Sequence, residues 1–128
     1  MNIRYNSVED EFLPLIEKAK LEMSKRKNLN NGQIIVMLSS KGNLYFAIIT
    51  DICTMCEPDR DIALLEELSQ VNDAHIEKLI CMWAGGGFDI PSYTFRKKLC
   101  AINEKNSNAE MLLCSENVYI KKTIAESF

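Results

Sequence analysis

The sequence is poor in histidine, glycine and proline, and these scarcities exclude several kinds of protein. His75 is the only histidine among 128 residues, which weighs against a Ser-His-Asp triad and against a metal site built on several imidazoles. Glycine contributes 5 residues and proline 3, while hydrophobic residues reach 47%. This composition excludes a fibrous or disordered chain and is typical of a globular domain.

Long apolar runs and a large excess of one charge are also absent. No run approaches the roughly 20 apolar residues that cross a bilayer, and the polar beginning shows no signal-peptide pattern. Fifteen lysines and arginines oppose 18 aspartates and glutamates, and the net charge of −3 attracts neither nucleic acid nor an anionic membrane. We therefore expect a soluble, cytoplasmic protein with a single domain over residues 1–128 and no nucleic-acid or membrane partner.

The cysteines are odd in number, and without a secretory signal they are expected to be reduced: Cys53, Cys56, Cys81, Cys100 and Cys114. Cys81 and Cys114 lie in apolar runs, where a thiol behaves as a small buried hydrophobe. Cys53 and Cys56 form a Cys-x-x-Cys pair, a spacing found in zinc sites and redox dithiols. A structural zinc would need two further ligands, and the other candidates are isolated, so we favour two half-buried cysteines in a connection.

Apolar spacing and turn residues indicate the elements of the first half of the chain. A first helix is predicted by apolar residues that share one face: Phe12, Ile16, Ala19 and Met23. Two almost continuously apolar runs, 33–39 and 43–50, flank a Ser-Lys-Gly turn and predict a hairpin of strands that are covered on both faces.

The second half continues with alternating helices and strands. A helix begins at Pro58 or Asp59 and is followed by a buried strand at 78–84. A third helix is predicted with Asp89 as its cap and Pro91 in its first turn, and its inner face carries Phe95, Leu99 and Ile102. Two short strands and a final short helix complete the chain after residue 108. This order predicts an α/β fold, a three-layer α/β/α sandwich with a mixed five-stranded sheet.

The order and the lengths resemble the small cytidine deaminases of the homotetrameric type. The matching pieces cover nearly the whole chain: LIEKAK, QIIVMLSSKGNLYFAIITD, PSYTFRKKL and NVYIKKTIAESF. The resemblance implies a cytidine deaminase-like fold and a homo-oligomer, either a dimer or a tetramer. It also implies that the last aromatic residue, Phe128, closes the pocket of a neighbouring subunit.

The motifs of the zinc chemistry do not match in the same way. Zinc deaminases need three Cys or His ligands and a proton-shuttling glutamate, arranged as His- or Cys-x-Glu followed by Pro-Cys-x-x-Cys. Ser92 and Phe95 stand after Pro91 where the resemblance places the two cysteines, and a serine hydroxyl is a poor zinc ligand and a phenyl ring is none. The first motif is also lost in either possible register. If Cys56 is the ligand, Glu57 follows it directly, and if the following helix sets the register, the motif falls on residues 58–60, which are Pro, Asp and Arg.

We therefore expect a non-catalytic, deaminase-like protein that binds a nucleoside or nucleotide or serves as an assembly subunit, with neither metal nor cofactor. The resemblance places the family's ribose-binding Asn-x-Glu motif at residues 49–51, where only Asp51 offers an acidic acceptor. The residues expected to line the pocket are Asp51, Cys56, Glu57, Ser92, Phe95, Arg96 and Phe128.

Two alternatives stay open at this point. In the first, Cys53 and Cys56 hold zinc and Glu57 shuttles protons, so that a rearranged site deaminates a pyrimidine nucleoside or a related amine. In the second, the chain is a protein-interaction module that binds no small ligand.

Overall fold

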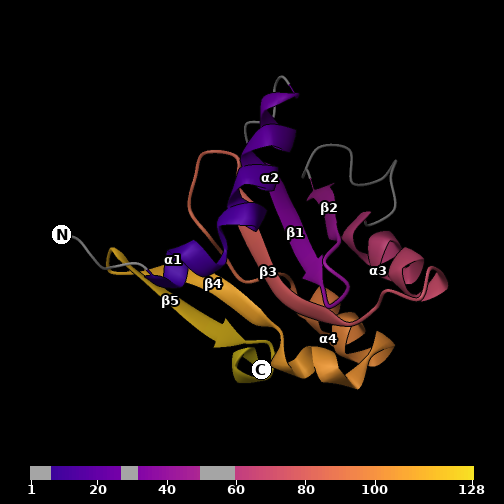
Figure 1. The fold of residues 1–128 in the computed structure, drawn as a ribbon. Coiled ribbons are helices and arrows are strands. Elements are labelled where there is room, and N and C mark those ends of the chain that lie inside the picture. The colour runs from indigo at the N-terminus through magenta and orange to yellow at the C-terminus, as the bar shows by residue number, and fades with distance from the viewer. Residues whose placement is uncertain (1–6, 27–31, 50–59) are drawn as a thin grey trace.

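The computed structural model describes residues 7–26, 32–49 and 60–128. Figure 1 shows its helices and strands: α1 (Ser7–Glu11), α2 (Leu13–Ser24), β1 (Gln33–Ser39), β2 (Leu44–Ile49), α3 (Arg60–Gln70), β3 (Ile76–Trp83), α4 (Tyr93–Ile102), β4 (Glu110–Ser115) and β5 (Val118–Thr123). Two 3-10 turns, η1 (Glu104–Asn108) and η2 (Ala125–Ser127), follow α4 and β5. The predicted start of the second helix at Pro58 or Asp59 lies outside the described residues.

The strands form one mixed sheet in the order β2-β1-β3-β4-β5. β1 is antiparallel to both β2 and β3, β3 is parallel to β4, and β4 is antiparallel to β5. The parallel pair needs a crossover between its strands, and α4 supplies it. The predicted hairpin and the predicted mixed five-stranded sheet are therefore confirmed.

Helices cover both faces of this sheet, as the apolar runs predicted. Along β1, Ile34 and Val36 pack toward α2, whereas Ile35 and Met37 pack on the other face beneath α3 and α4. All four side chains are at most 1% exposed. Figure 1 shows the same division, with α2 over one face of the sheet and α3 and α4 over the other, so the three-layer sandwich is confirmed.

The ends of two strands differ from the prediction. β3 begins at Ile76, two residues before the predicted start, because the Ile76 amide donates a hydrogen bond of 2.7 Å to the side chain of Asn106. Cys114, predicted to be buried, is exposed. β4 pairs with β3 only at Glu110 and Met111, so the end of β4 that carries Cys114 extends beyond the core.

A buried carboxylate joins the hairpin to the connection between α3 and β3. Oδ2 of Asp73 accepts hydrogen bonds from Ser39 Oγ at 3.0 Å, Asn43 Nδ2 at 2.9 Å and Tyr45 OH at 2.6 Å. Burial alone would raise the pKa of Asp73, but the hydrogen bonds, above all that of Tyr45, outweigh burial and hold the pKa below its ordinary value. The carboxylate therefore stays charged and fixes the hairpin in its register.

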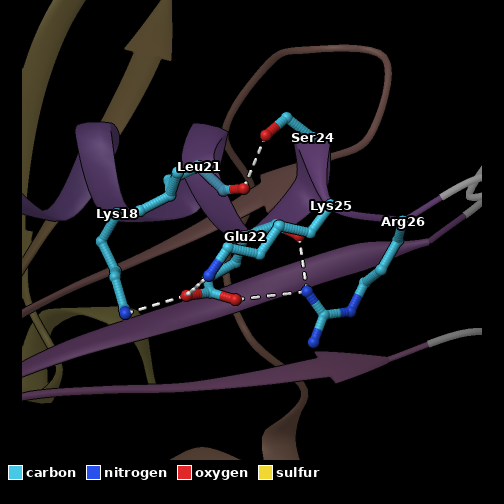
Figure 2. Close-up of polar contacts among 6 residues, drawn as sticks. All are labelled: Lys18, Leu21, Glu22, Ser24, Lys25 and Arg26. Atoms are coloured by element: carbon cyan, nitrogen blue, oxygen red, sulfur yellow. Dashed lines mark hydrogen bonds and ion pairs between the residues drawn. The ribbon is translucent and has the colours of Figure 1, made fainter.

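A second carboxylate, that of Glu22, organises the contact between α2 and β2. Figure 2 shows the Glu22 side chain between Lys18 and Arg26, with Lys25 as its third cationic partner. Lys18 and Arg26 also lie above the ring of Phe46 on β2, 5.2 and 5.6 Å from its centroid. The hydrogen bond from Lys18, followed by those from Arg26 and Lys25, lowers the pKa of Glu22 from 4.5 to about 2 despite its burial.

We predict that Glu22→Gln lowers the melting temperature at pH 7 and that this loss shrinks as the pH falls. The folded pKa of Glu22 lies below its unfolded value, so its contribution is present above pH 4.5 and disappears as the pH falls toward about 2. Thermal unfolding followed by circular dichroism at pH 7, 4, 3 and 2 measures this dependence. Glu17→Gln, on the exposed side of the same helix, is the control. A loss that is the same at every pH contradicts the prediction.

Candidate functional site

The candidate site is the start of α4. A glycine-rich turn at residues 85–87 connects β3 to this region and places it beside the end of β3. Gly86 and Gly87 have φ angles of +99° and +94°, a region in which side chains are strained, and the Asp89 amide then donates to the Cys81 carbonyl at 2.8 Å. The N-cap of α4 is Ser92, whose Oγ accepts the backbone N–H of Phe95 at 3.1 Å. The Ser92 hydroxyl is therefore engaged in capping the helix. The prediction of Asp89 as the cap, with Pro91 in the first turn, is therefore wrong, because the helix begins at Tyr93.

Phe95 lies on the inner face of α4 and is completely buried. Its ring belongs to the core cluster between α4 and the sheet, together with Leu99 one turn later and Met37 of β1. A side chain in this position supplies packing energy but no donor or acceptor. The position that the resemblance assigns to a metal-binding cysteine thus holds a core residue.

Cys81, whose carbonyl accepts the Asp89 amide, has a thiol that is 1% exposed, as the sequence predicted. Burial, together with the charges of Asp89 and Asp61, raises the pKa of the Cys81 thiol to about 12. The thiol is therefore protonated at neutral pH. Within residues 7–26, 32–49 and 60–128, no three His, Cys, Asp or Glu side chains are arranged to hold a metal ion.

Arg96 joins the two ends of this region. Its Nε donates to the Pro91 carbonyl at 2.9 Å, and its Nη1 donates to the carbonyl and the Oγ of Ser127 at 2.8 and 2.9 Å. These bonds hold the turn η2 against α4. A guanidinium carries five N–H donors, so the two on Nη2 are left without a partner in the described part of the chain.

A groove lies beside Arg96 on the outer face of α4. The rings of Tyr93 and Phe128 meet edge to face, with centroids 5.8 Å apart and an interplanar angle of 90°. The Arg96 guanidinium carbon lies 5.1 Å from the centroid of the Phe128 ring. The groove has a volume of about 830 Å³, and its lining is Tyr93, Arg96, Lys97, Cys100, Ala101, Ser127 and Phe128.

The structure divides the residues that were predicted to line one pocket. Arg96 and Phe128 come together in the groove, whereas Ser92 caps the helix and Phe95 is buried on its inner face. The remaining members of the predicted site lie outside the described residues, and their roles stay predictions: Asp51, Cys53, Cys56 and Glu57.

Sequence reasoning missed the contribution of Tyr93 and Lys97 to the groove. The signal was present, because positions 93, 96, 97 and 100 have the i, i+3, i+4, i+7 spacing of a single helix face. From the sequence alone, the basic run 96–99 on this face is expected to be solvated, although Arg96 near the pocket could hold a phosphate. This helix face forms a groove only because Phe128 packs against Tyr93, and the two residues are 35 positions apart in the sequence.

Comparison with solved structures identifies the fold. The chain is similar to the cytidine deaminase from Mycobacterium leprae, with a TM-score of 0.67 and 11% identity over 96% of this chain and 98% of that one. For the cytidine deaminase from Bacillus anthracis the TM-score is 0.69, with 13% identity over 90% of this chain and 84% of that one. For the cytidine deaminase from Mycobacterium tuberculosis the TM-score is 0.66, with 12% identity over 91% of this chain and 93% of that one.

These similarities establish that the chain has a cytidine deaminase-like fold, and the predicted resemblance is confirmed at that level. Because the identities are only 11–13%, these similarities show the fold alone. The sequence matches no protein-family model and no curated protein. In the part of the chain that the structure describes, no helix combines the length and the apolarity needed to cross a membrane.

We predict that Ser92→Ala lowers the free energy of unfolding by about 1 kcal/mol, because the Phe95 amide loses its acceptor at the helix start. Urea denaturation at pH 7 measures the change. Thr94→Ala removes a hydroxyl from the first turn of the same helix, where the side chain is exposed and caps nothing, and serves as the control. Equal effects of the two substitutions would show that the Ser92 hydroxyl is not a cap.

Proposed function

We propose that this chain is a cytidine deaminase-like protein that binds a nucleoside or nucleotide and does not deaminate it. The observation that supports the proposal is the start of α4, where Ser92 is engaged as a helix cap and Phe95 is buried in the core. The resemblance places two metal-binding cysteines at these positions. A cytoplasmic homo-oligomer is part of the same proposal.

The chemical argument concerns the activation of water. Hydrolytic deamination requires a nucleophile that attacks the ring carbon bearing the amine, and bulk water at neutral pH is too weakly acidic to supply it. A zinc ion held by three protein ligands lowers the pKa of its bound water to about 7. With Ser92 and Phe95 in place of two ligands, a metal at this helix start would lose most of its protein donors, so we expect no hydroxide to form.

The groove supports the binding part of the proposal. Its two aromatic rings offer surfaces on which a base can stack, and Arg96 offers a guanidinium whose position is fixed by Pro91 and Ser127. Phe128 is 56% exposed, so its ring is accessible in the isolated chain. The same exposed ring is the feature that supports a homo-oligomer.

We predict that the purified protein releases no ammonia from cytidine or deoxycytidine and carries close to no zinc. Protein from zinc-supplemented medium, prepared without a chelator or a histidine tag, is analysed for zinc per chain and for ammonia by a coupled assay. Close to one zinc per chain together with metal-dependent ammonia release would overturn the proposal. Loss of both on Cys56→Ala would then assign the activity to a rearranged site at Cys53, Cys56 and Glu57.

We predict that a pyrimidine nucleoside or its monophosphate raises the melting temperature of the protein. A ligand that binds only the folded state stabilises it by RT ln(1 + [L]/Kd), so a ligand at about 100 times its Kd contributes about 2.7 kcal/mol. Thermal shift with cytidine, uridine and their monophosphates measures the effect, and ribose is the control without a ring system to stack. No shift with any of them at millimolar concentration would favour an interaction module without a small ligand.

A further inference from the structure

We propose that the groove on the outer face of α4 is a binding site for a planar aromatic anion, and that it takes a pyrimidine nucleoside monophosphate in preference to the uncharged nucleoside. This inference rests on the proposed function for the choice of base. The groove itself supplies the rest of the argument. Its cations and its fixed guanidinium favour an anion, and its two exposed rings favour a planar ligand.

The first step is the charge of the lining. Arg96 and Lys97 contribute two adjacent cations, and none of the residues that line the groove is an aspartate or a glutamate. Neither cation forms an ion pair with a side chain in the described ranges, whereas the next residue, Lys98, lies 3.7 Å from the carboxylate of Glu66. A chain with a net charge of −3 thus keeps a local positive site, which favours the entry of an anion.

The second step is the fixed orientation of the guanidinium. The carbonyl of Pro91 and the carbonyl and hydroxyl of Ser127 are neutral acceptors, so they hold Arg96 in place without cancelling its charge. The two N–H groups of Nη2 remain for a ligand. Phosphate and carboxylate oxygens match these donors, and the side-chain entropy of Arg96 is already lost before a ligand binds.

The third step is the pair of rings. Tyr93 is 60% exposed and Phe128 is 56% exposed, although both are large apolar side chains. Their perpendicular arrangement forms a corner in which a planar ligand can stack on one ring and contact the edge of the other. The volume of about 830 Å³ falls within the range of small-molecule sites, which is roughly 300–1,000 Å³.

The groove is separate from the core-facing side of α4. Phe95 and Leu99 point into the core, whereas Tyr93, Arg96 and Lys97 line the groove on the outer side. A ligand can therefore enter without any opening of the core.

Isothermal titration of the wild-type chain with cytidine 5′-monophosphate, cytidine and inorganic phosphate tests the proposal. We expect the monophosphate to bind about tenfold more tightly than cytidine, since charge-assisted hydrogen bonds are the difference between them. Inorganic phosphate, which lacks a ring, should bind more weakly than the monophosphate.

The decisive variant is Lys97→Gln, because the Lys97 side chain is exposed and contacts only the ring of Tyr93, so the fold should be retained. It should weaken binding of the monophosphate several-fold and thereby reduce the preference for the monophosphate over cytidine. Lys98→Gln is the matched control: it makes the same change one residue later, where the cation faces Glu66 instead of the groove, and should leave the affinity unchanged. Tyr93→Ser should weaken both ligands, because both stack.

The outcomes separate this inference from the proposed function. Equal affinities for cytidine and its monophosphate, with no effect of Lys97→Gln, would overturn the anion site and leave nucleoside binding standing. Inorganic phosphate binding as tightly as the monophosphate would also overturn it, since the rings would then play no part. Binding of none of the three would remove both proposals. Sedimentation equilibrium showing a dimer that Tyr93→Ser dissociates, without ligand binding, would assign the groove to a second copy of the chain.

Discussion

The rest of the structure depends on the burial of both faces of β1 and β3. Residues 34–37 of β1 are at most 1% exposed and point alternately to α2 and to the layer of α3 and α4. A strand of this kind is stable only when helices cover each face. α4 meets that requirement by placing Phe95 and Leu99 on the sheet, and the 3.6-residue period of the helix then turns Tyr93 and Arg96 outward. The core thus determines which residues of α4 a ligand can reach.

The same requirement accounts for the stability that side chains give to the start of α4. A helix start carries unpaired N–H groups and the positive end of the helix dipole, which stabilise thiolates and other anions. Here Ser92 accepts the Phe95 N–H, and the Phe95 ring is fully buried, which contributes about 2 kcal/mol of transfer free energy. Metal binding contributes to folding in structural zinc sites. At the start of α4, a cap and a packed ring contribute stability.

Much of the fold could be predicted from the sequence, because periodicity is a local signal. The continuous apolar run at 33–39 predicted a strand buried on both faces, and the spacing of Phe95 and Leu99 predicted the inner face of α4. Contacts between distant polar residues carry no such signal. Tyr45 and Asp73 are 28 residues apart and Arg96 and Ser127 are 31 apart, so neither pair could be inferred from spacing. The groove was missed for this reason. The resemblance placed Ser92 and Phe95 in a pocket, whereas Ser92 caps α4 and Phe95 is buried in the core.

The arrangement around Arg96 depends on the shape of a guanidinium. Its planar fork reaches the Pro91 carbonyl at the beginning of α4 and both acceptors of Ser127 near the end of the chain, and two donors still remain. A lysine ammonium is a point charge on a flexible stem with three donors, so it could not serve all of these acceptors in a fixed plane. Because Arg96 bonds Ser127 in η2 and its guanidinium lies over the Phe128 ring, the position of that ring depends on this side chain as well. The residue that fixes one wall of the groove therefore also supplies its charge.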